Sequence, residues 1–163
     1  MRYCLKLILL VFLLASCTKA TDKAAAPMPD RVIGSIKNNV YSVVNTKDIK
    51  HEWETALAIA GDTLTLDDFK IEKSVTTGDS KIECFMIMAK SSDGKTSVAA
   101  LINQKDNYFY FIEDNFVSVV CKAECKDGCL PVALSYKGVV KLVCSNCTAC
   151  IKSDVMVNLP SNN

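Results

Sequence analysis

The sequence predicts an α+β fold, in which one helix lies against an antiparallel sheet and a cysteine-rich segment follows. Apolar residues recur at helical spacing in one stretch, residues 47–60. Four β-favouring runs then follow one another at a spacing of about 12 residues. The connections between these runs are too short for the helical crossovers that a parallel sheet needs.

Two β-favouring runs open the predicted domain. Residues 31–36 and 40–44 flank the turn residues Lys37, Asn38 and Asn39. Because asparagine tolerates the left-handed backbone conformation of tight turns, this pattern predicts an N-terminal hairpin.

Residues 47–60 predict the one helix. Thr46 and Asp48 are the candidate N-cap residues, and Gly61 is expected to close the helix at its C-terminal end. One face of the helix is apolar and should pack against the sheet, with Trp53 at its centre. This face comprises Ile49, Trp53, Ala56, Leu57 and Ala60.

The runs that follow the helix predict the strands of the sheet. A polar turn that contains Gly78 ends the first run, and Ser92-Asp93-Gly94 is a strong hairpin signal before the third. The second run is apolar on both faces except for Glu83. The four predicted strands are residues 69–76, 82–89, 96–102 and 108–112.

Residues 117–163 differ in character from the residues before them. Two β-favouring runs remain, at 117–121 and 139–143, but six cysteines now fall within 30 residues. We therefore predict a cysteine-rich C-terminal module that packs on the α+β domain formed by residues 31–116.

The first 16 residues have the layout of a signal peptide. Arg2 and Lys6 precede an unbroken apolar run of eight residues, 7–14. This run is too short to span the hydrocarbon core of a bilayer, which takes about 20 helical residues, and it fits the apolar region of a signal peptide. We expect the chain to be exported and residues 1–16 to be removed.

The end of this leader resembles a lipobox, the recognition motif of bacterial lipoproteins. The motif is Leu14-Ala15-Ser16-Cys17, with small residues directly before the cysteine. The resemblance implies cleavage before Cys17 and lipid on that cysteine, and several acyl chains would anchor the chain stably to a membrane. An ordinary secretory signal, with Cys17 in a disulfide, is the alternative. In layout, the mature chain resembles small cysteine-rich bacterial lipoproteins of unassigned activity.

Residues 17–30 predict a lipidated cysteine and a flexible tether, because the segment after Cys17 is small, polar and proline-containing. Its 13 residues could reach on the order of 43–47 Å from a bilayer. Thr18 follows the cysteine, in place of the aspartate that often marks inner-membrane retention in lipoproteins. This favours the outer membrane.

The six clustered cysteines form two triplets, the first with three residues between neighbours and the second with two. In an exported protein, nearby thiols usually form disulfides, and each disulfide could contribute about 2–4 kcal/mol to stability. Disulfides are therefore our main hypothesis, although the sequence does not fix their connectivity. The triplets are Cys121, Cys125, Cys129 and Cys144, Cys147, Cys150.

A metal or iron–sulfur site in this cluster is the alternative. The second triplet matches the first three ligands of a bacterial ferredoxin run, but Asp154 and Val155 stand where a cysteine and a proline would follow. Thr148 stands where covalent haem attachment needs a histidine. A redox-active Cys-x-x-Cys is a third hypothesis. We expect no cofactor and no metal.

Other residues that could carry chemistry have simpler structural explanations. His51, the only histidine, should point away from the apolar face of the helix. Asp67 and Asp68 directly precede a predicted strand as a polar turn. Cys84 alternates with apolar residues on one strand face, so we expect a buried small hydrophobe, with pairing to a cluster cysteine as the alternative.

The mature chain is close to neutral. Removal of residues 1–16 takes away two basic side chains and no acidic ones, which leaves 17 basic and 18 acidic side chains. This balance provides no field that gathers phosphates, so we expect no nucleic-acid partner.

These observations predict a membrane-anchored, non-enzymatic envelope lipoprotein that serves as a binding or structural module. The membrane is the expected partner through Cys17, and no protein or small-molecule partner can be specified. Residues 108–111 are the one hint of a binding surface outside the cysteines, since their aromatic side chains alternate across both faces of a strand. The alternative is a metal-binding, iron–sulfur or thiol-redox envelope protein that uses the cysteine cluster.

Overall fold

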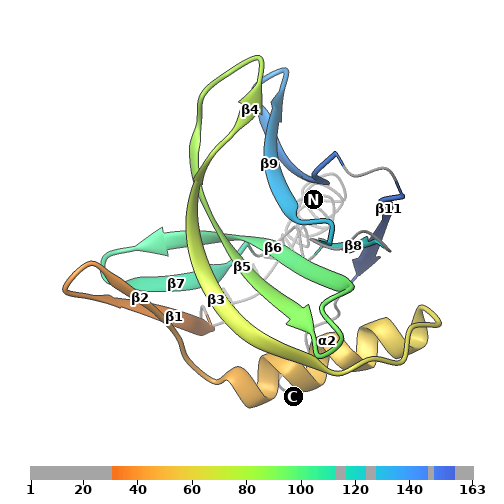
Figure 1. Cartoon of the computed structure of the whole chain (residues 1–163). Coiled ribbons are helices and arrows are strands. Elements are labelled where there is room, and N and C mark those ends of the chain that lie inside the picture. The colour runs from red at the N-terminus through yellow and green to blue at the C-terminus, as the bar shows by residue number, and fades with distance from the viewer. Residues whose placement is uncertain (1–30, 113–116, 124–127, 147–148, 157–163) are drawn as a thin grey trace, which may run out of the picture.

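A computed structural model describes residues 31–112, 117–123, 128–146 and 149–156 (Figure 1). Within these residues, one helix accompanies an eight-stranded sheet and a three-stranded sheet. All strand pairs are antiparallel except one short parallel pair. The predicted fold class, one helix with a mostly antiparallel sheet, is therefore confirmed.

The elements follow one another along the chain with short connections. The helix is α2 (Thr46–Ile59). The main sheet consists of β1 (Val32–Lys37), β2 (Val40–Val43), β3 (Leu66–Val75), β5 (Glu83–Ser91), β6 (Thr96–Lys105), β7 (Tyr108–Phe111), β8 (Val117–Lys122) and β11 (Ile151–Met156). The second sheet consists of β4 (Thr77–Gly78), β9 (Pro131–Tyr136) and β10 (Val139–Cys144).

The main sheet branches at β6. One edge of this strand pairs with β5, which in turn pairs with β3. The other edge is divided, since residues 96–99 pair with β8 and residues 102–105 pair with β7. Beyond β7 the sheet continues through β1 to β2, and beyond β8 it ends at β11. The first strand, β1, and the last, β11, therefore belong to one sheet, in which β6 connects their branches through β7 and β8.

The helix ends as its sequence predicts but begins differently. Gly61 follows the C-cap residue with φ 96°, and its N–H donates to the carbonyl of Ala58 at 3.1 Å. The next N–H, of Asp62, donates to the carbonyl of Leu57 at 2.8 Å, which completes a Schellman-type end. The N-cap residue is Asn45, with φ 54° and no side-chain bond. The predicted N-caps, Thr46 and Asp48, were therefore wrong.

Asp67 and Asp68 lie within β3, not before the strand as predicted. The ladder with β5 shifts between Asp67 and Lys70, and Asp68 has φ 52°. Such a bulge accommodates an extra residue while pairing continues on both sides. As a result β3 starts at Leu66, and Asp67 is placed beside the helix.

A first core lies between the main sheet, the helix and the β1–β2 hairpin. Ile49, Trp53 and Leu57 of α2 are buried in it. Trp53 packs against Phe69 with ring centroids 5.7 Å apart. Ala60, expected on the same face, is exposed at the helix end.

The β1–β2 hairpin, at one end of the main sheet, lies close to β3 and β5 of the same sheet. The Tyr41 ring packs edge-on against Phe85 and Phe109, with centroids 5.7 Å away in each case. A Cβ atom on Gly34 would lie 2.2 Å from Cδ1 of Ile71. Glycine at this position therefore allows the hairpin backbone to lie against β3.

A second core lies on the opposite face of the main sheet, under the β9–β10 hairpin. Alternate residues of β5 divide between the two cores, with Ile87 in the first and Met86 and Met88 in the second. The second core contains four of the clustered cysteines. Its buried members are Met86, Met88, Ala99, Val119, Cys121, Ala123, Cys129, Ala133 and Leu142, and Cys84, Leu101, Val140, Cys144 and Cys150 pack against them.

Candidate functional site: the cysteine cluster

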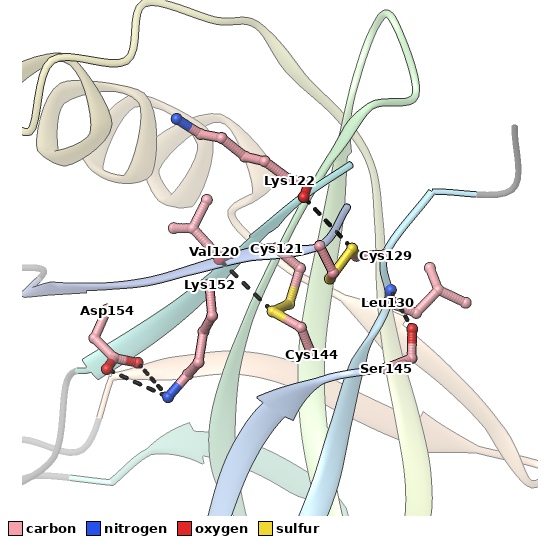
Figure 2. The surroundings of a disulfide bond; sticks show 10 residues. Val120, Cys121, Lys122, Cys129, Leu130, Cys144, Ser145, Lys152 and Asp154 are labelled. Atoms are coloured by element: carbon pink, nitrogen blue, oxygen red, sulfur yellow. Dashed lines mark hydrogen bonds and ion pairs between the residues drawn. A yellow bond between two sulfur atoms is a disulfide. The ribbon is translucent and has the colours of Figure 1, made fainter. Parts of the chain in front are cut away.

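Four of the six clustered cysteines form two disulfide bonds (Figure 2). Cys121 pairs with Cys144 at a Cα–Cα distance of 5.6 Å, and Cys129 pairs with Cys150 at 5.9 Å. Both distances are usual for protein disulfides. The predicted disulfide bonding is confirmed for these four residues, and each bond joins the two triplets. The remaining cysteines, at positions 125 and 147, lie outside the described residues.

The first disulfide joins the two sheets. Cys121 is fully buried in β8, where it is opposite Lys152 of β11 and Ser97 of β6. Cys144 is the last residue of β10 and is opposite Pro131 of β9. The bond therefore connects the main sheet to the hairpin that covers its second core.

The second disulfide fixes the entry to the hairpin. Cys129 is fully buried just before β9, and Cys150 directly precedes β11. The Cys129 sulfur lies 3.4 Å from the carbonyl oxygen of Lys122 at the end of β8. A disulfide sulfur has no proton to donate, so this approach is a packing contact. The bond holds the start of β9 beside the strands β8 and β11.

Backbone bonds extend the hairpin beyond its last ladder pair. The N–H of Ser145 donates to the carbonyl of Leu130 at 2.8 Å. The N–H of Leu130 donates to the Ser145 hydroxyl at 3.0 Å (Figure 2). Both residues directly follow a disulfide cysteine in the sequence. Hydrogen bonds and disulfides thus close the same end of the hairpin.

Cys84 is the free cysteine of the described residues. It lies on β5, where it packs against the second core but is half-buried, not fully buried as expected. Pairing of Cys84 with a cluster cysteine, the alternative from the sequence, is not what the structure has. Burial raises the pKa of its thiol. The reactive thiolate is therefore a minor form at neutral pH, and Cys84 is a weak nucleophile.

The disulfides limit what the cluster can do chemically. The sulfur atoms of four cysteines are bonded in two pairs. None of these four therefore supplies a thiolate for zinc, iron or nucleophilic attack. Among the described residues, no group of three or more His, Cys, Asp or Glu side chains is placed to hold a metal ion.

Asp79, in the connection between β4 and β5, makes a second link to the β9–β10 hairpin, which the sequence did not reveal. One of its carboxylate oxygens accepts a hydrogen bond from the Ser135 hydroxyl at 2.7 Å, and the other accepts from the backbone N–H of Lys137 at 2.5 Å. These bonds, above all the one from Ser135, hold the pKa of the Asp79 carboxyl below its usual value. The partners are 56 and 58 residues away in the chain, so only a turn could be predicted from the local sequence.

The other candidate residues are accounted for by their surroundings. His51 is exposed on α2, as expected. Asp67 binds Lys50 of the helix at 3.0 Å and accepts from the Ser92 hydroxyl at 2.5 Å. The Ser92 bond and then the Lys50 bond lower the pKa of this carboxyl. Asp67 therefore ties the helix to the β5–β6 turn.

The aromatic run of β7 divides between core and surface, as its alternation predicted. Phe109 is fully buried, whereas Tyr108 is 49% exposed. Phe109 packs on Phe85 with ring centroids 5.1 Å apart. One face of the strand thus belongs to the first core, and the other presents a tyrosine.

Cys17, the expected lipid-accepting residue, and the motif before it lie outside the described residues. Within the part of the chain that the structure describes, no helix is both long enough and apolar enough to cross a membrane. Disulfides are typical of oxidising, exported compartments.

Comparison of the chain with protein-family models, with curated proteins and with solved structures finds no match.

Proposed function

We propose that this chain is an exported lipoprotein of the bacterial envelope, whose mature domain is a non-enzymatic binding or structural module. Lipid on Cys17 would hold it on the outer membrane, and the tether would separate the domain from the bilayer. The sequence of the leader and its lipobox-like end support the anchor. The single observation that carries the proposal is the pair of disulfides between the two triplets.

The disulfides support export for a physical reason. They lie within a buried core and join segments that otherwise meet only through packing and a few hydrogen bonds. Such bonds form and persist in oxidising compartments, whereas cytosolic thiols are kept reduced. A domain closed in this way matches a leader that directs export.

The non-enzymatic part of the proposal rests on the surroundings of the candidate groups. A general base needs an oriented partner and a nearby nucleophile. His51 lies on the exposed side of α2, and four cluster cysteines are consumed in disulfides. Cys84 has a raised pKa because it is buried.

Replacement of the proposed lipid-accepting residue tests the anchor. The full chain and its Cys17→Ser variant would be expressed in a bacterium, and both membrane fractions would be analysed by intact mass. We expect the parent chain to lose residues 1–16 and to gain acyl chains, because the thiol of Cys17 accepts the lipid. The variant should stay unprocessed and unlipidated.

Cys4→Ser is the matched control, since Cys4 lies in the proposed leader. It should behave like the parent chain. A parent chain that is cleaved at another site, or that reaches the periplasm without lipid, would refute the anchor.

A further inference from the structure

The β9–β10 hairpin has an inner and an outer face. Pro131, Ala133 and Ser135 of β9 are buried, and Leu142 of β10 belongs to the second core. In an antiparallel ladder, directly opposite residues share a face, and neighbours along a strand alternate. The outer face is therefore formed by the pairs Val132 with Val143, Leu134 with Lys141, and Tyr136 with Val139.

This outer face is unusually apolar for an exposed surface. Tyr136 and Val139 are 56% and 55% exposed, although they lie directly opposite each other. Val75, at the end of β3 beside β4, is 52% exposed. The half-buried members of the outer face belong to neither of the two cores. Neighbouring exposed apolar side chains of this kind mark interaction surfaces.

The outer face is held in a fixed shape. β4 pairs in parallel with β9, beside the tip of the β3–β5 hairpin (Figure 1). A Cβ atom on Gly78 would lie 2.1 Å from the carbonyl oxygen of Ser135, at φ 100°, so a glycine is needed for this approach. Asp79 then binds Ser135 and the N–H of Lys137. A preformed surface loses little conformational freedom on binding.

Two lysines lie on or directly beside this face. Lys141 lies in its middle pair, and Lys137 lies in the β9–β10 turn, with its Nζ 5.3 Å from the centre of the Tyr136 ring. No salt bridge within the described residues involves either lysine. The outer face itself carries no acidic side chain. Asp79, at the edge, keeps its negative charge, but both of its oxygens accept hydrogen bonds from the hairpin, from the Ser135 hydroxyl and the N–H of Lys137.

We infer that the outer face of the β9–β10 hairpin docks on an anionic lipid surface. Tyr136 and Val139 enter the headgroup region, where an aromatic ring with a polar end is favoured. Lys137 and Lys141 extend their apolar stems along this surface and place their ammonium groups at the lipid phosphates. This inference rests on the proposed function, because the anchor on Cys17 would keep the face within reach of a bilayer.

The same charges disfavour a second copy of the chain as the occupant. A two-fold axis through the middle of the outer face would bring the Lys141 residues of both copies together. Like charges in close contact oppose such an interface. A lipid surface with negative headgroups has the complementary charge instead.

Tryptophan reporters on the full chain test the inference. Val139→Trp places a reporter on the outer face, and Val40→Trp is the matched control on the β1–β2 hairpin, since Val40 is 61% exposed. Each protein is reconstituted with phosphatidylcholine vesicles, with or without phosphatidylglycerol, that carry brominated acyl chains as quenchers. The buried Trp53 is common to both proteins, and its emission reports that the variants are folded.

We expect the Val139→Trp reporter to be quenched at least about twofold more strongly than the Val40→Trp control on anionic vesicles. High salt, or Lys137→Gln with Lys141→Gln, should reduce this difference. Equal quenching at both positions, or none at Val139→Trp, would overturn the inference. So would a concentration-dependent blue shift without lipid, which would indicate a second copy. The intact mass shows separately whether Cys17 carries acyl chains. Failure of the docking face can therefore be distinguished from failure of the anchor.

Discussion

Asp79 shows how a single side chain can join the β9–β10 hairpin to the connection between β4 and β5. Its carboxylate accepts from the Ser135 hydroxyl and from the N–H of Lys137, both at the tip of the β9–β10 hairpin. The pKa of this carboxyl is lowered because both partners stabilise the charged form. The bonds are therefore present above the usual Asp pKa of 3.8 and are lost as the pH falls through the lowered value of the folded state.

Asp79→Asn should lower the denaturant midpoint at neutral pH, because the amide is uncharged and one of its two polar atoms is no longer an acceptor. Between about pH 5 and pH 2, its stability should also fall less steeply than that of the parent chain. Urea unfolding followed by circular dichroism across this pH range checks both effects. Asp68→Asn is the control, since Asp68 has φ 52° and asparagine tolerates that conformation. An Asp79→Asn profile that matches the parent at every pH would rule out the junction.

The β9–β10 hairpin is the element that depends most on the disulfides. Cys121–Cys144 and Cys129–Cys150 close loops of 23 and 21 residues. In the chain-entropy account, each loop of this size contributes about 3 kcal/mol by restricting the unfolded chain. The two bonds therefore stabilise the folded domain by an amount similar to that of a group of well-packed core side chains.

Replacement of Cys121 and Cys144 together by alanine should lower the free energy of unfolding by about 3 kcal/mol. The expected lesion is local, with loss of the hairpin from the second core before the first core unfolds. Hydrogen exchange of the β9 and β10 amides measures this directly. Cys84→Ala removes a free thiol from the same core and should cost less. If both replacements were equally destabilising, or if exchange rose uniformly, the disulfide would not hold the hairpin.

The elements that sequence reasoning found are those with a strong local signal. The helix shows apolar residues at helical spacing, and β5 and β6 combine β-favouring residues with a Ser92-Asp93-Gly94 turn between them. These elements carry most of the first core. The burial of their residues is therefore visible in the local sequence pattern.

The strands β9 and β11 were not predicted, because their signals depend on tertiary context. In β9 the buried residues are Pro131, Ala133 and Ser135, which are small or polar because the hairpin lies close to the sheet and Ser135 binds Asp79. In β11, Ile151 is 66% exposed. Neither strand shows the alternation of large apolar and polar residues by which a half-buried strand is recognised.

The cysteine cluster was predicted by residue type but not by partner. The spacing identified the six members, and export favoured disulfides over metal. Which cysteine meets which depends on β8 pairing with β6 and β11, and on the hairpin folding back over the second core. These are contacts between distant parts of the sequence, so the triplets alone could not supply the pairing.

The whole molecule divides into three parts that follow one another along the chain. The proposed leader and lipid anchor come first, and the sheet-and-helix domain follows. The disulfide-bonded β9–β10 hairpin then covers the second core on the opposite face of the sheet. The last two parts are connected by the Cys121–Cys144 bond, which joins β8 of the main sheet to β10 of the hairpin. The proposed docking face lies on the outermost layer of this arrangement, where a tethered domain could meet a membrane.

The most direct test of this account is the intact mass of the chain from the membrane fraction, alkylated without reduction and analysed together with its metal content. We predict acyl chains on Cys17, one alkylated thiol at Cys84 and three disulfides among the six clustered cysteines, with no stoichiometric metal. Several alkylated cluster thiols together with bound zinc or iron, or a Cys17 without lipid, would contradict it.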